Sequence, residues 1–166
     1  VYPTGARPGR LPPPMRHYAQ VVILRDPIAR FKSGFRHRIM HLRDIETAKG
    51  KAAKPHGLPL QPTPDEFVER LEDYMAAVPI VHHHFLPQHR FMPTAIDGKV
   101  LVIGLAQLDR FAELLGSRAK RPIEVPHLQT GGAELKVPPL STAALDRLRA
   151  FYARDYELTA QHGITA

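Results

Sequence analysis

The chain contains no cysteine, and this absence excludes several kinds of functional site. Disulfide bonds, thiolate-bound metal ions and a cysteine nucleophile all require a side chain that the sequence does not have. Nothing in its 166 residues approaches the roughly 18 consecutive apolar residues of a transmembrane helix, and its first residues lack the hydrophobic run of a signal peptide. We therefore expect a soluble chain without a membrane segment, in a reducing compartment such as the cytoplasm.

Acidic residues are scarce relative to basic ones. The sequence has 16 Asp and Glu against 23 Lys and Arg, which gives a net charge of +7 at pH 7 with neutral histidines. This balance favours anionic partners such as nucleotides, sulfated sugars or nucleic acid, and it does not choose among them. The length predicts one domain over residues 1–166, because a second independent core is not expected at this size.

The N-terminal segment is rich in proline and glycine. Proline lacks a backbone donor and glycine lacks conformational restraint, so residues 1–20 are expected to form a loop rather than a helix or central strand. The prolines and glycines of this segment are Pro3, Gly5, Pro8, Gly9, Pro12, Pro13 and Pro14.

The most informative stretch is residues 21–36. Val21–Leu24 is a short, continuous apolar run, as expected for a parallel strand that is covered on both faces. Asp26 and Pro27 then have the residue types of a helix N-cap and a first helical position. The helix that follows is predicted from an apolar stripe at helical spacing, formed by Ile28, Phe31, Phe35, Ile39 and Leu42.

A hydroxyl and several cations share the opposite face of this predicted helix. Ser33 falls opposite the apolar stripe, and the residues that flank it are Arg30, Arg36 and His37. A helix that begins directly after a strand offers unpaired N–H groups and the positive end of its dipole, and ligands collect at the carboxyl ends of parallel strands. The sequence therefore predicts an anion site here, with a solvated basic helix face as the alternative interpretation.

The same residues carry a resemblance to a known family. The pattern Arg25-Asp-Pro-x-x-Arg30-x-x-Ser33-x-Phe35 after an apolar strand resembles the 3′-phosphate-binding motif of sulfotransferases that use 3′-phosphoadenosine 5′-phosphosulfate, in particular the carbohydrate (type 2) group. In that family the arginine that ends the strand and the serine in the helix bind the 3′-phosphate of the nucleotide. The resemblance therefore implies that Arg25 and Ser33 bind the co-substrate.

One part of the family pattern has no counterpart in this sequence. The family has a first strand and a loop resembling Pro-Lys-x-Gly-Thr-Thr before the 3′-phosphate motif, and this loop holds the 5′-phosphosulfate. Residues 4–10 contain glycine and cations, but no apolar strand precedes them and Pro8 removes one donor. We therefore expect either a sulfotransferase-like domain that is N-terminally incomplete or a protein that does not transfer sulfate alone, and we assign no catalytic residue.

A basic loop and a second helix follow. Residues 46–63 mix glycine, proline and lysine without periodicity, which is typical of a surface loop. The resemblance places a segment bordering the acceptor cleft here, where Lys49, Lys51 and Lys54 would meet an acidic acceptor; a solvated loop is the alternative. Thr63-Pro64-Asp65-Glu66 combines an N-cap with a capping box. It predicts a helix whose inner face is formed by Phe67, Val68, Leu71, Tyr74, Met75 and Val78.

The three histidines at 82–84 admit two interpretations. Imidazole is a common zinc ligand, but in an extended segment only His82 and His84 would share a face, so a third ligand would have to come from elsewhere. The segment His84-Phe85-Leu86-Pro87-Gln88 also resembles the family's His-Trp-x-Pro-Gln segment, which lies near the cleft. The resemblance makes His84 a candidate for acceptor contact or proton transfer, with a packed structural histidine as the alternative. We expect no metal ion.

A second strand followed by a helix is predicted further along the chain. Residues 99–105 form an apolar run, and residues 107–116 have helical spacing with Gly116 just after the helix end. This region resembles the family's Tyr-Asp-Phe-Ile-Gly-x-x-Glu segment, with Ala106 or Gln107 in place of the glutamate. The inner face of the helix is expected to be formed by Leu108, Phe111, Leu114 and Leu115.

The C-terminal part supplies two weaker matches to the family. Residues 125–130 resemble its Pro-His-x-Asn-x-Ser segment, within a long loop that lies near the nucleotide in relatives. Ser141 is expected to cap a last helix through about residue 158. Within this helix, the segment from Tyr152 to Tyr156 resembles the family's closing Tyr-x-x-Asp pattern, and we expect it to have a packing role.

The resemblance covers residues 18–158 and implies an α/β fold, with a three-layer parallel sheet flanked by helices and similar to P-loop nucleoside kinases. The implied activity is transfer of a sulfuryl group from 3′-phosphoadenosine 5′-phosphosulfate to a hydroxyl, most simply of a carbohydrate, by a bacterial cytoplasmic enzyme. Two alternatives stay open. One is a noncatalytic sulfotransferase-like module that binds a nucleotide or a partner protein, and the other is a basic nucleic-acid-binding domain, which we rank below the enzyme.

Overall fold

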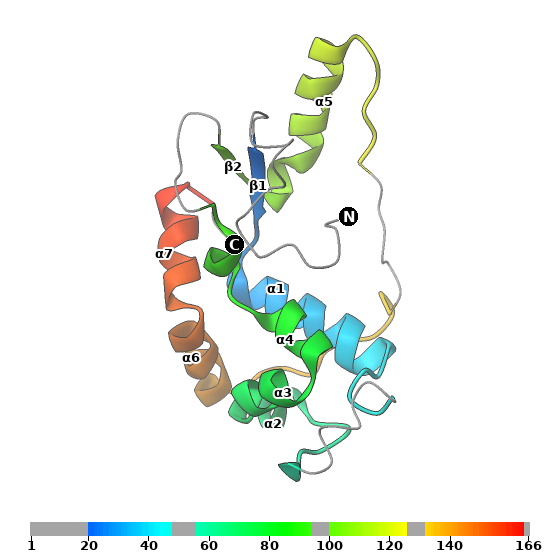
Figure 1. The fold of residues 1–166 in the computed structure, drawn as a ribbon, viewed down its shortest axis with the longest axis vertical. Helices are drawn as coiled ribbons and strands as arrows, with labels where there is room; N and C mark the ends of the chain where they lie inside the picture. The colour runs from blue at the N-terminus through cyan, green and yellow to red at the C-terminus, as the bar shows by residue number, and fades with distance from the viewer. Residues whose placement is uncertain (1–19, 48–55, 94–99, 126–131, 165–166) are drawn as a thin grey trace. The chain divides into compact units, whose positions relative to one another are not determined.

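The computed structural model describes residues 20–47, 56–93, 100–125 and 132–164 (Figure 1). The chain divides into two compact units. Unit 1 consists of residues 1–26, 87–127 and 154–166, and unit 2 consists of residues 27–86 and 128–153. These units are defined by contacts between residues, whereas a domain is defined by folding on its own. The prediction of one domain over residues 1–166 therefore stays a prediction.

Unit 1 contains both described strands, and the described regular elements of unit 2 are helices. The elements of unit 1 are β1 (Gln20–Leu24), the 3₁₀ helix η4 (Gln88–Phe91), β2 (Val100–Gly104), the 3₁₀ helix η5 (Leu105–Gln107), α5 (Leu108–Ala119) and α7 (Ala153–Gln161). The first residue of α7, Ala153, belongs to unit 2. The elements of unit 2 are α1 (Pro27–Gly34), η2 (Phe35–His41), α2 (Pro64–Glu69), α3 (Leu71–Ala77), α4 (Pro79–Phe85) and α6 (Thr142–Phe151).

The two strands, β1 and β2 in Figure 1, pair in parallel. Val21 lies opposite Leu101, and Leu24 lies opposite Gly104. Both lie where the sequence predicted strands, and a parallel pair agrees with an α/β fold. Side chains alternate between the two faces, and Val21 and Leu101 on one face are 41% and 46% exposed. On the same face Ile23 is also exposed, whereas Ile103 is buried. Because much of this face is open to solvent, the three-layer sheet with both faces covered is not confirmed and stays a prediction.

Three helix starts lie where the sequence predicted them. Helix α1 begins at Pro27. At α2 the Thr63 hydroxyl accepts from the Glu66 N–H at 3.3 Å, and the Glu66 carboxylate accepts from the Thr63 N–H at 2.7 Å, which completes the capping box. At α6 the Ser141 hydroxyl accepts from the Ala144 N–H at 3.2 Å. These starts are set by residues close in sequence.

The first predicted helix changes type part of the way along. After α1, η2 is a π-helix, and the Leu42 N–H donates to the His37 carbonyl, five residues earlier, at 3.0 Å. Each π-type turn holds more residues than an α-helical turn, so the residues after it are rotated out of the α-helical stripe. Phe35 and Ile39 are buried as predicted, whereas Leu42 is 39% exposed. The predicted place of Leu42 on the inner stripe is therefore wrong.

Aromatic rings form the core of unit 2. Phe67 of α2 is fully buried, and its ring centroid lies 4.8 Å from that of Tyr74, 4.9 Å from that of Phe85 and 5.4 Å from that of Phe35. These contacts join η2, α2, α3 and α4 through pairs that pack edge-on, tilted or stacked. The predicted inner face of this segment is confirmed, although the backbone breaks at Arg70 into two helices.

Helix α5 continues past its predicted end. Lys120, rather than Gly116, adopts the left-handed conformation after the helix, with φ of 52°. Gly116 lies inside the helix, where an added Cβ would come 3.0 Å from the Arg121 carbonyl oxygen. The glycine therefore permits a close approach of the following chain instead of ending the helix. The predicted inner face is also wrong for Leu114 and Leu115, which are exposed.

The last predicted helix is two helices. The backbone breaks at Tyr152, where φ is −99° and ψ is 18°, so α6 ends there and α7 begins. The Tyr152 hydroxyl donates to the Phe85 carbonyl at 2.9 Å in a buried setting. This hydrogen bond joins residues 67 positions apart, which the local helical pattern does not reveal.

Several predictions fall outside the described residues. They concern the loop at residues 4–10, the acceptor-facing Lys49, Lys51 and Lys54, and most of the loop around residues 125–130. In the part of the chain that the structure describes, no helix combines the length and apolar character needed to cross a membrane.

Candidate functional site

Arg25 lies directly after β1, and the Gln88 side chain forms hydrogen bonds with both its backbone N–H and its backbone carbonyl. The Arg25 N–H donates to Gln88 Oε1 at 3.0 Å, and Gln88 Nε2 donates to the Arg25 carbonyl at 2.7 Å. The Gln88 amide therefore takes the place of a neighbouring strand for this residue. The Arg25 side chain is half-buried, and its guanidinium makes no hydrogen bond or ion pair with another residue in the described ranges.

Ser33 lies on α1 and thus in unit 2, whereas Arg25 belongs to unit 1. The Ser33 side chain is half-buried, and its hydroxyl makes no hydrogen bond with any described residue. Phe31 and Phe35 on the same helical segment are buried, which agrees with the predicted polar position of Ser33. Joint binding of one phosphate group by Arg25 and Ser33 stays a prediction.

A buried carboxylate organises the segment that carries Gln88. Asp155 of α7 is fully buried, and it accepts hydrogen bonds from the Gln88 N–H at 2.6 Å and from the His89 N–H at 2.8 Å. The His89 Nδ1 lies 2.8 Å from the Asp155 Oδ1, and it carries the hydrogen of this contact because a carboxylate only accepts. Three hydrogen bonds therefore satisfy the buried group.

The packing role predicted for the Tyr152–Tyr156 segment is incomplete, since Asp155 acts through hydrogen bonds. The missed contacts join Gln88 to Arg25 and to Asp155, at separations of 63 and 67 residues. The sequence did contain a signal, because Pro87-Gln88 and the Tyr-x-x-Asp pattern were both matched to the family. Neither match indicated which residue Gln88 or Asp155 contacts, so their hydrogen bond is seen only in the structure.

The C-terminal end of α4 is fixed within unit 2 by two side chains. Arg30 Nη2 donates to the His84 carbonyl at 3.0 Å, and the Tyr152 hydroxyl donates to the Phe85 carbonyl at 2.9 Å. Carbonyls in the last turn of a helix have no intrahelical donor, so these bonds satisfy groups that would otherwise need water. Arg30, in the middle of the 3′-phosphate pattern, therefore has a structural contact that the pattern did not indicate.

His84, the candidate for acceptor contact or proton transfer, lies in surroundings that oppose its protonation. Burial is the main reason that the pKa of His84 is lowered to about 4, and electrostatic repulsion from Arg38, His83, His37 and Arg30 adds to the effect. The imidazole is therefore neutral at pH 7. Because a general base works best when its pKa lies near the working pH, this side chain suits acceptor contact better than proton transfer.

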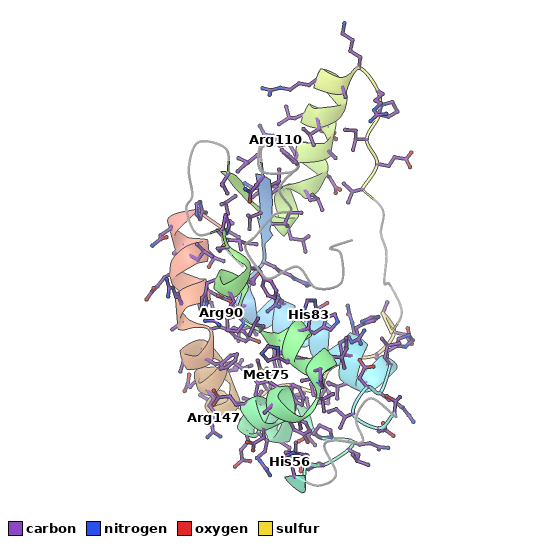
Figure 2. All side chains as sticks on the ribbon, in the orientation of Figure 1. His56, Met75, His83, Arg90, Arg110 and Arg147 are labelled. Carbon is purple, nitrogen blue, oxygen red and sulfur yellow. The ribbon has the colours of Figure 1, made fainter. Side chains whose placement is uncertain are left out.

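The three histidines lie on a helix, whereas the metal interpretation assumed an extended segment. On α4, His82 and His83 are exposed and His84 is half-buried (His83 is labelled in Figure 2). The rings of His83 and His84 are inclined at 88°, with their centroids 5.4 Å apart. Within the described ranges, no group of three or more His, Asp or Glu side chains is arranged to hold a metal ion.

A hollow of about 300 Å³ in unit 2 is a poor match for an anionic nucleotide. It is lined by residues of α2, α3 and α6 and by Arg70 between α2 and α3. Its charged residues are Glu69, Arg70, Glu72, Asp73 and Arg147 (Arg147 is labelled in Figure 2). Its carboxylates outnumber its guanidinium groups, so the local field disfavours a phosphate. Ser33 is not part of its lining.

Comparison with known proteins identifies the family. The model of the sulfotransferase family matches residues 9–158, which include Arg25, Ser33, Gln88 and Asp155. Comparisons with curated proteins and with solved structures gave no match. The matched range agrees with the resemblance seen in the pattern from Arg25 to Phe35, and the family's general activity is sulfuryl transfer. The chain therefore belongs to the sulfotransferase family.

Proposed function

We propose that this chain takes the sulfuryl group from 3′-phosphoadenosine 5′-phosphosulfate and that Arg25 binds the 3′-phosphate of this donor. Family membership supports sulfuryl transfer in general. The observation that carries the finer proposal is the setting of Arg25, whose backbone N–H and carbonyl are both held while no described residue engages its guanidinium. A guanidinium presents a rigid fork of donors that matches a phosphate through parallel, charge-assisted hydrogen bonds.

Ser33 is the second proposed ligand of the 3′-phosphate. Its hydroxyl supplies one donor from the polar face of α1, and no described residue uses that donor. The spacing between Arg25 and Ser33 is the spacing of the family pattern. The contribution of Ser33 is smaller than that of Arg25, because hydrogen bonds from neutral donors are weaker than those from charged ones.

The proposed reaction is an in-line displacement at sulfur, analogous to phosphoryl transfer. The acceptor hydroxyl oxygen attacks the sulfur, and the bond between the sulfur and the bridging phosphate oxygen breaks. Adenosine 3′,5′-bisphosphate leaves with the electron pair of that bond, and the hydroxyl proton passes to a base that we do not assign. Holding the 3′-phosphate contributes by keeping the sulfur aligned with the acceptor.

We propose a carbohydrate hydroxyl as the acceptor. The resemblance to the carbohydrate group supports this choice. Lys32 and Arg36 also favour an acidic sugar, whereas Arg38 of the same segment is paired with Asp44. The neutral imidazole of His84 would accept a hydrogen bond from a sugar hydroxyl. The same proposal includes a three-layer, P-loop-like sheet. It names no residue that would bind the 5′-phosphosulfate.

Calorimetric titration with adenosine 3′,5′-bisphosphate tests the assignment of Arg25. Arg25→Ala is expected to weaken binding by at least about tenfold, on the scale of a lost hydrogen bond to a charged group. Arg110→Ala is a matched control, because Arg110 is exposed on α5 of the same unit (Figure 2), and it should keep the wild-type affinity. Equal affinities of the wild type and Arg25→Ala would overturn the assignment.

Two further measurements separate the proposal from its alternatives. A nucleic-acid-binding domain would bind with a steep salt dependence and without preference for a 3′-phosphate. A noncatalytic module would bind the nucleotide weakly or not at all, and it would transfer no radiolabelled sulfate from the donor to a sugar acceptor. Selective binding together with transfer is the combination that the proposal requires.

A further inference from the structure

We propose that Gln88 and Asp155 are positioning residues that fix Arg25 for recognition of the 3′-phosphate, an inference that rests on the proposed function. Asp155 holds the backbone of Gln88, and the Gln88 side chain holds the backbone of Arg25. All three residues belong to unit 1. They form a continuous series of hydrogen bonds that ends at the residue carrying the proposed phosphate-binding guanidinium.

The Gln88 contact is specific to the point where β1 ends. The register of the sheet stops at the pair of Leu24 and Gly104, so Arg25 has no strand partner in the described sheet. The Gln88 amide meets both polar groups of the Arg25 backbone, at 3.0 and 2.7 Å, and Gln88 is 8% exposed. The planar amide uses its oxygen and one N–H and so reproduces the hydrogen bonds of a neighbouring strand, which fixes the direction in which the Arg25 side chain leaves the backbone.

Asp155 in turn fixes where the Gln88 side chain starts. Its carboxylate is fully buried, and its contacts with the N–H groups of Gln88 and His89 are 2.6 and 2.8 Å long. Burying a carboxylate is unfavourable unless donors surround it, so this part of the chain can adopt few other arrangements without leaving the group unsatisfied. The turn that presents Gln88 is therefore rigidly placed relative to α7.

Rigid placement matters because an arginine side chain is long and flexible. Ordering such a side chain on binding costs conformational entropy, and a mobile backbone would add to that cost. A site whose supporting hydrogen bonds are already formed orders fewer groups when the ligand arrives. Gln88 and Asp155 therefore contribute to affinity for the 3′-phosphate without touching it.

The affinity ratio between two nucleotides separates this role from a purely structural one. Adenosine 3′,5′-bisphosphate and adenosine 5′-monophosphate differ by the 3′-phosphate, so the ratio of their affinities isolates its recognition. A substitution that only loosens the fold lowers both affinities and leaves the ratio unchanged. A substitution that misplaces Arg25 lowers the ratio itself.

Gln88→Leu removes both hydrogen bonds to Arg25 and is expected to lower this ratio about fivefold. This reduction is smaller than the one expected for Arg25→Ala. The matched control is Gln107→Leu, because the Gln107 side chain accepts from the Gly104 N–H at 2.9 Å at the end of the other strand. The control should destabilise unit 1 and keep the wild-type ratio. If Gln88→Leu does not fold, Gln88→Glu replaces it, since glutamate keeps the acceptor for the Arg25 N–H and loses the donor to the Arg25 carbonyl.

The outcomes distinguish the inference from the function on which it rests. The inference is supported if the Gln88 variant has a lowered ratio and the double variant with Arg25→Ala has the same ratio as Arg25→Ala alone. A wild-type ratio in the Gln88 variant, alongside a lost ratio in Arg25→Ala, overturns the inference and leaves the proposed function standing. A wild-type ratio in Arg25→Ala overturns both.

Discussion

Unit 2 is built around aromatic rings that exclude water, whereas unit 1 leaves many of its large apolar side chains in contact with solvent. Among the described residues, the largest fully buried side chains belong to unit 2 except for Leu24 and Asp155. All but Leu42 of the exposed large hydrophobic residues belong to unit 1, and they are Val21, Ile23, Leu101, Leu105, Leu114, Leu115 and Ile123.

The difference indicates that the two units are held together by different interactions. Apolar burial stabilises unit 2 through contacts that have little directional preference. In unit 1 the contacts from Asp155 through Gln88 to Arg25 are hydrogen bonds, which depend strongly on distance and angle. The proposed phosphate-binding arginine therefore lies in the unit where geometry is set by polar contacts.

The largest effect on stability is expected from the aromatic core. Phe67→Ala should lower the free energy of unfolding by about 3–5 kcal/mol, because it removes a fully buried ring that contacts several others. Urea denaturation measures this change. Phe151→Ala, at a half-buried position of α6, should cost clearly less. Equal losses for the two variants would contradict the central place of Phe67 in unit 2.

A smaller loss is expected from the polar network of unit 1. Asp155→Asn keeps the shape of the side chain and replaces one acceptor by a donor, which faces an N–H group of Gln88 or His89. We expect a loss of about 1–3 kcal/mol in the same denaturation experiment. Asp146→Asn is the control, because the Asp146–Arg149 ion pair is exposed and should contribute less than about 1 kcal/mol. A neutral Asp155→Asn would contradict the role of hydrogen bonds in this unit.

A pH-dependent effect is expected from His84 in unit 2. Its pKa is about 4 in the folded chain and 6.5 as the reference value for the unfolded chain, so the unfolded chain binds more protons between these values. The stability of the folded chain should therefore fall as the pH is lowered from about 6.5 to 4. His84→Gln should reduce the difference between melting temperatures at pH 7 and pH 5, and His82→Gln, at an exposed position, should preserve it. An unchanged difference in His84→Gln would count against the burial of this imidazole.

The smallest effect is expected at an exposed position of the sheet, on the face where Leu101 is exposed and Ile103 is buried. Leu101→Thr should change the free energy of unfolding by no more than about 0.5 kcal/mol, because the side chain is already 46% exposed. Ile103→Thr in the same strand should cost about 1–3 kcal/mol, since Ile103 is buried. A large loss for Leu101→Thr would mean that this face is covered in solution, as the three-layer fold requires.

Features encoded by neighbouring residues were predictable from the sequence. The Thr63–Glu66 capping box, the Ser141 cap and the start of α1 at Pro27 all depend on residues within one helical turn. The strands were predictable for a related reason, because β1 and β2 are short apolar runs. The 3′-phosphate pattern with Arg25 was likewise local.

Features that depend on distant residues were not predictable. The π-helix η2 and the breaks at Arg70 and Tyr152 interrupt segments whose apolar spacing is that of continuous α-helices. Tertiary hydrogen bonds, such as that from Tyr152 to Phe85, act on residues that helical periodicity treats as equivalent. The same limit explains why Gln88 and Asp155 were matched to the family without a role.

Competition between two isomeric nucleotides tests the central claim most directly. Adenosine 3′,5′-bisphosphate and adenosine 2′,5′-bisphosphate carry the same charge, so a nonspecific basic surface binds them equally. We predict that the wild-type chain prefers the 3′,5′-isomer by at least about tenfold, the scale of a charged hydrogen bond made to one isomer alone. Raising the salt concentration should weaken both complexes and keep the preference. Equal affinities for the two isomers would contradict recognition of the 3′-phosphate by this chain.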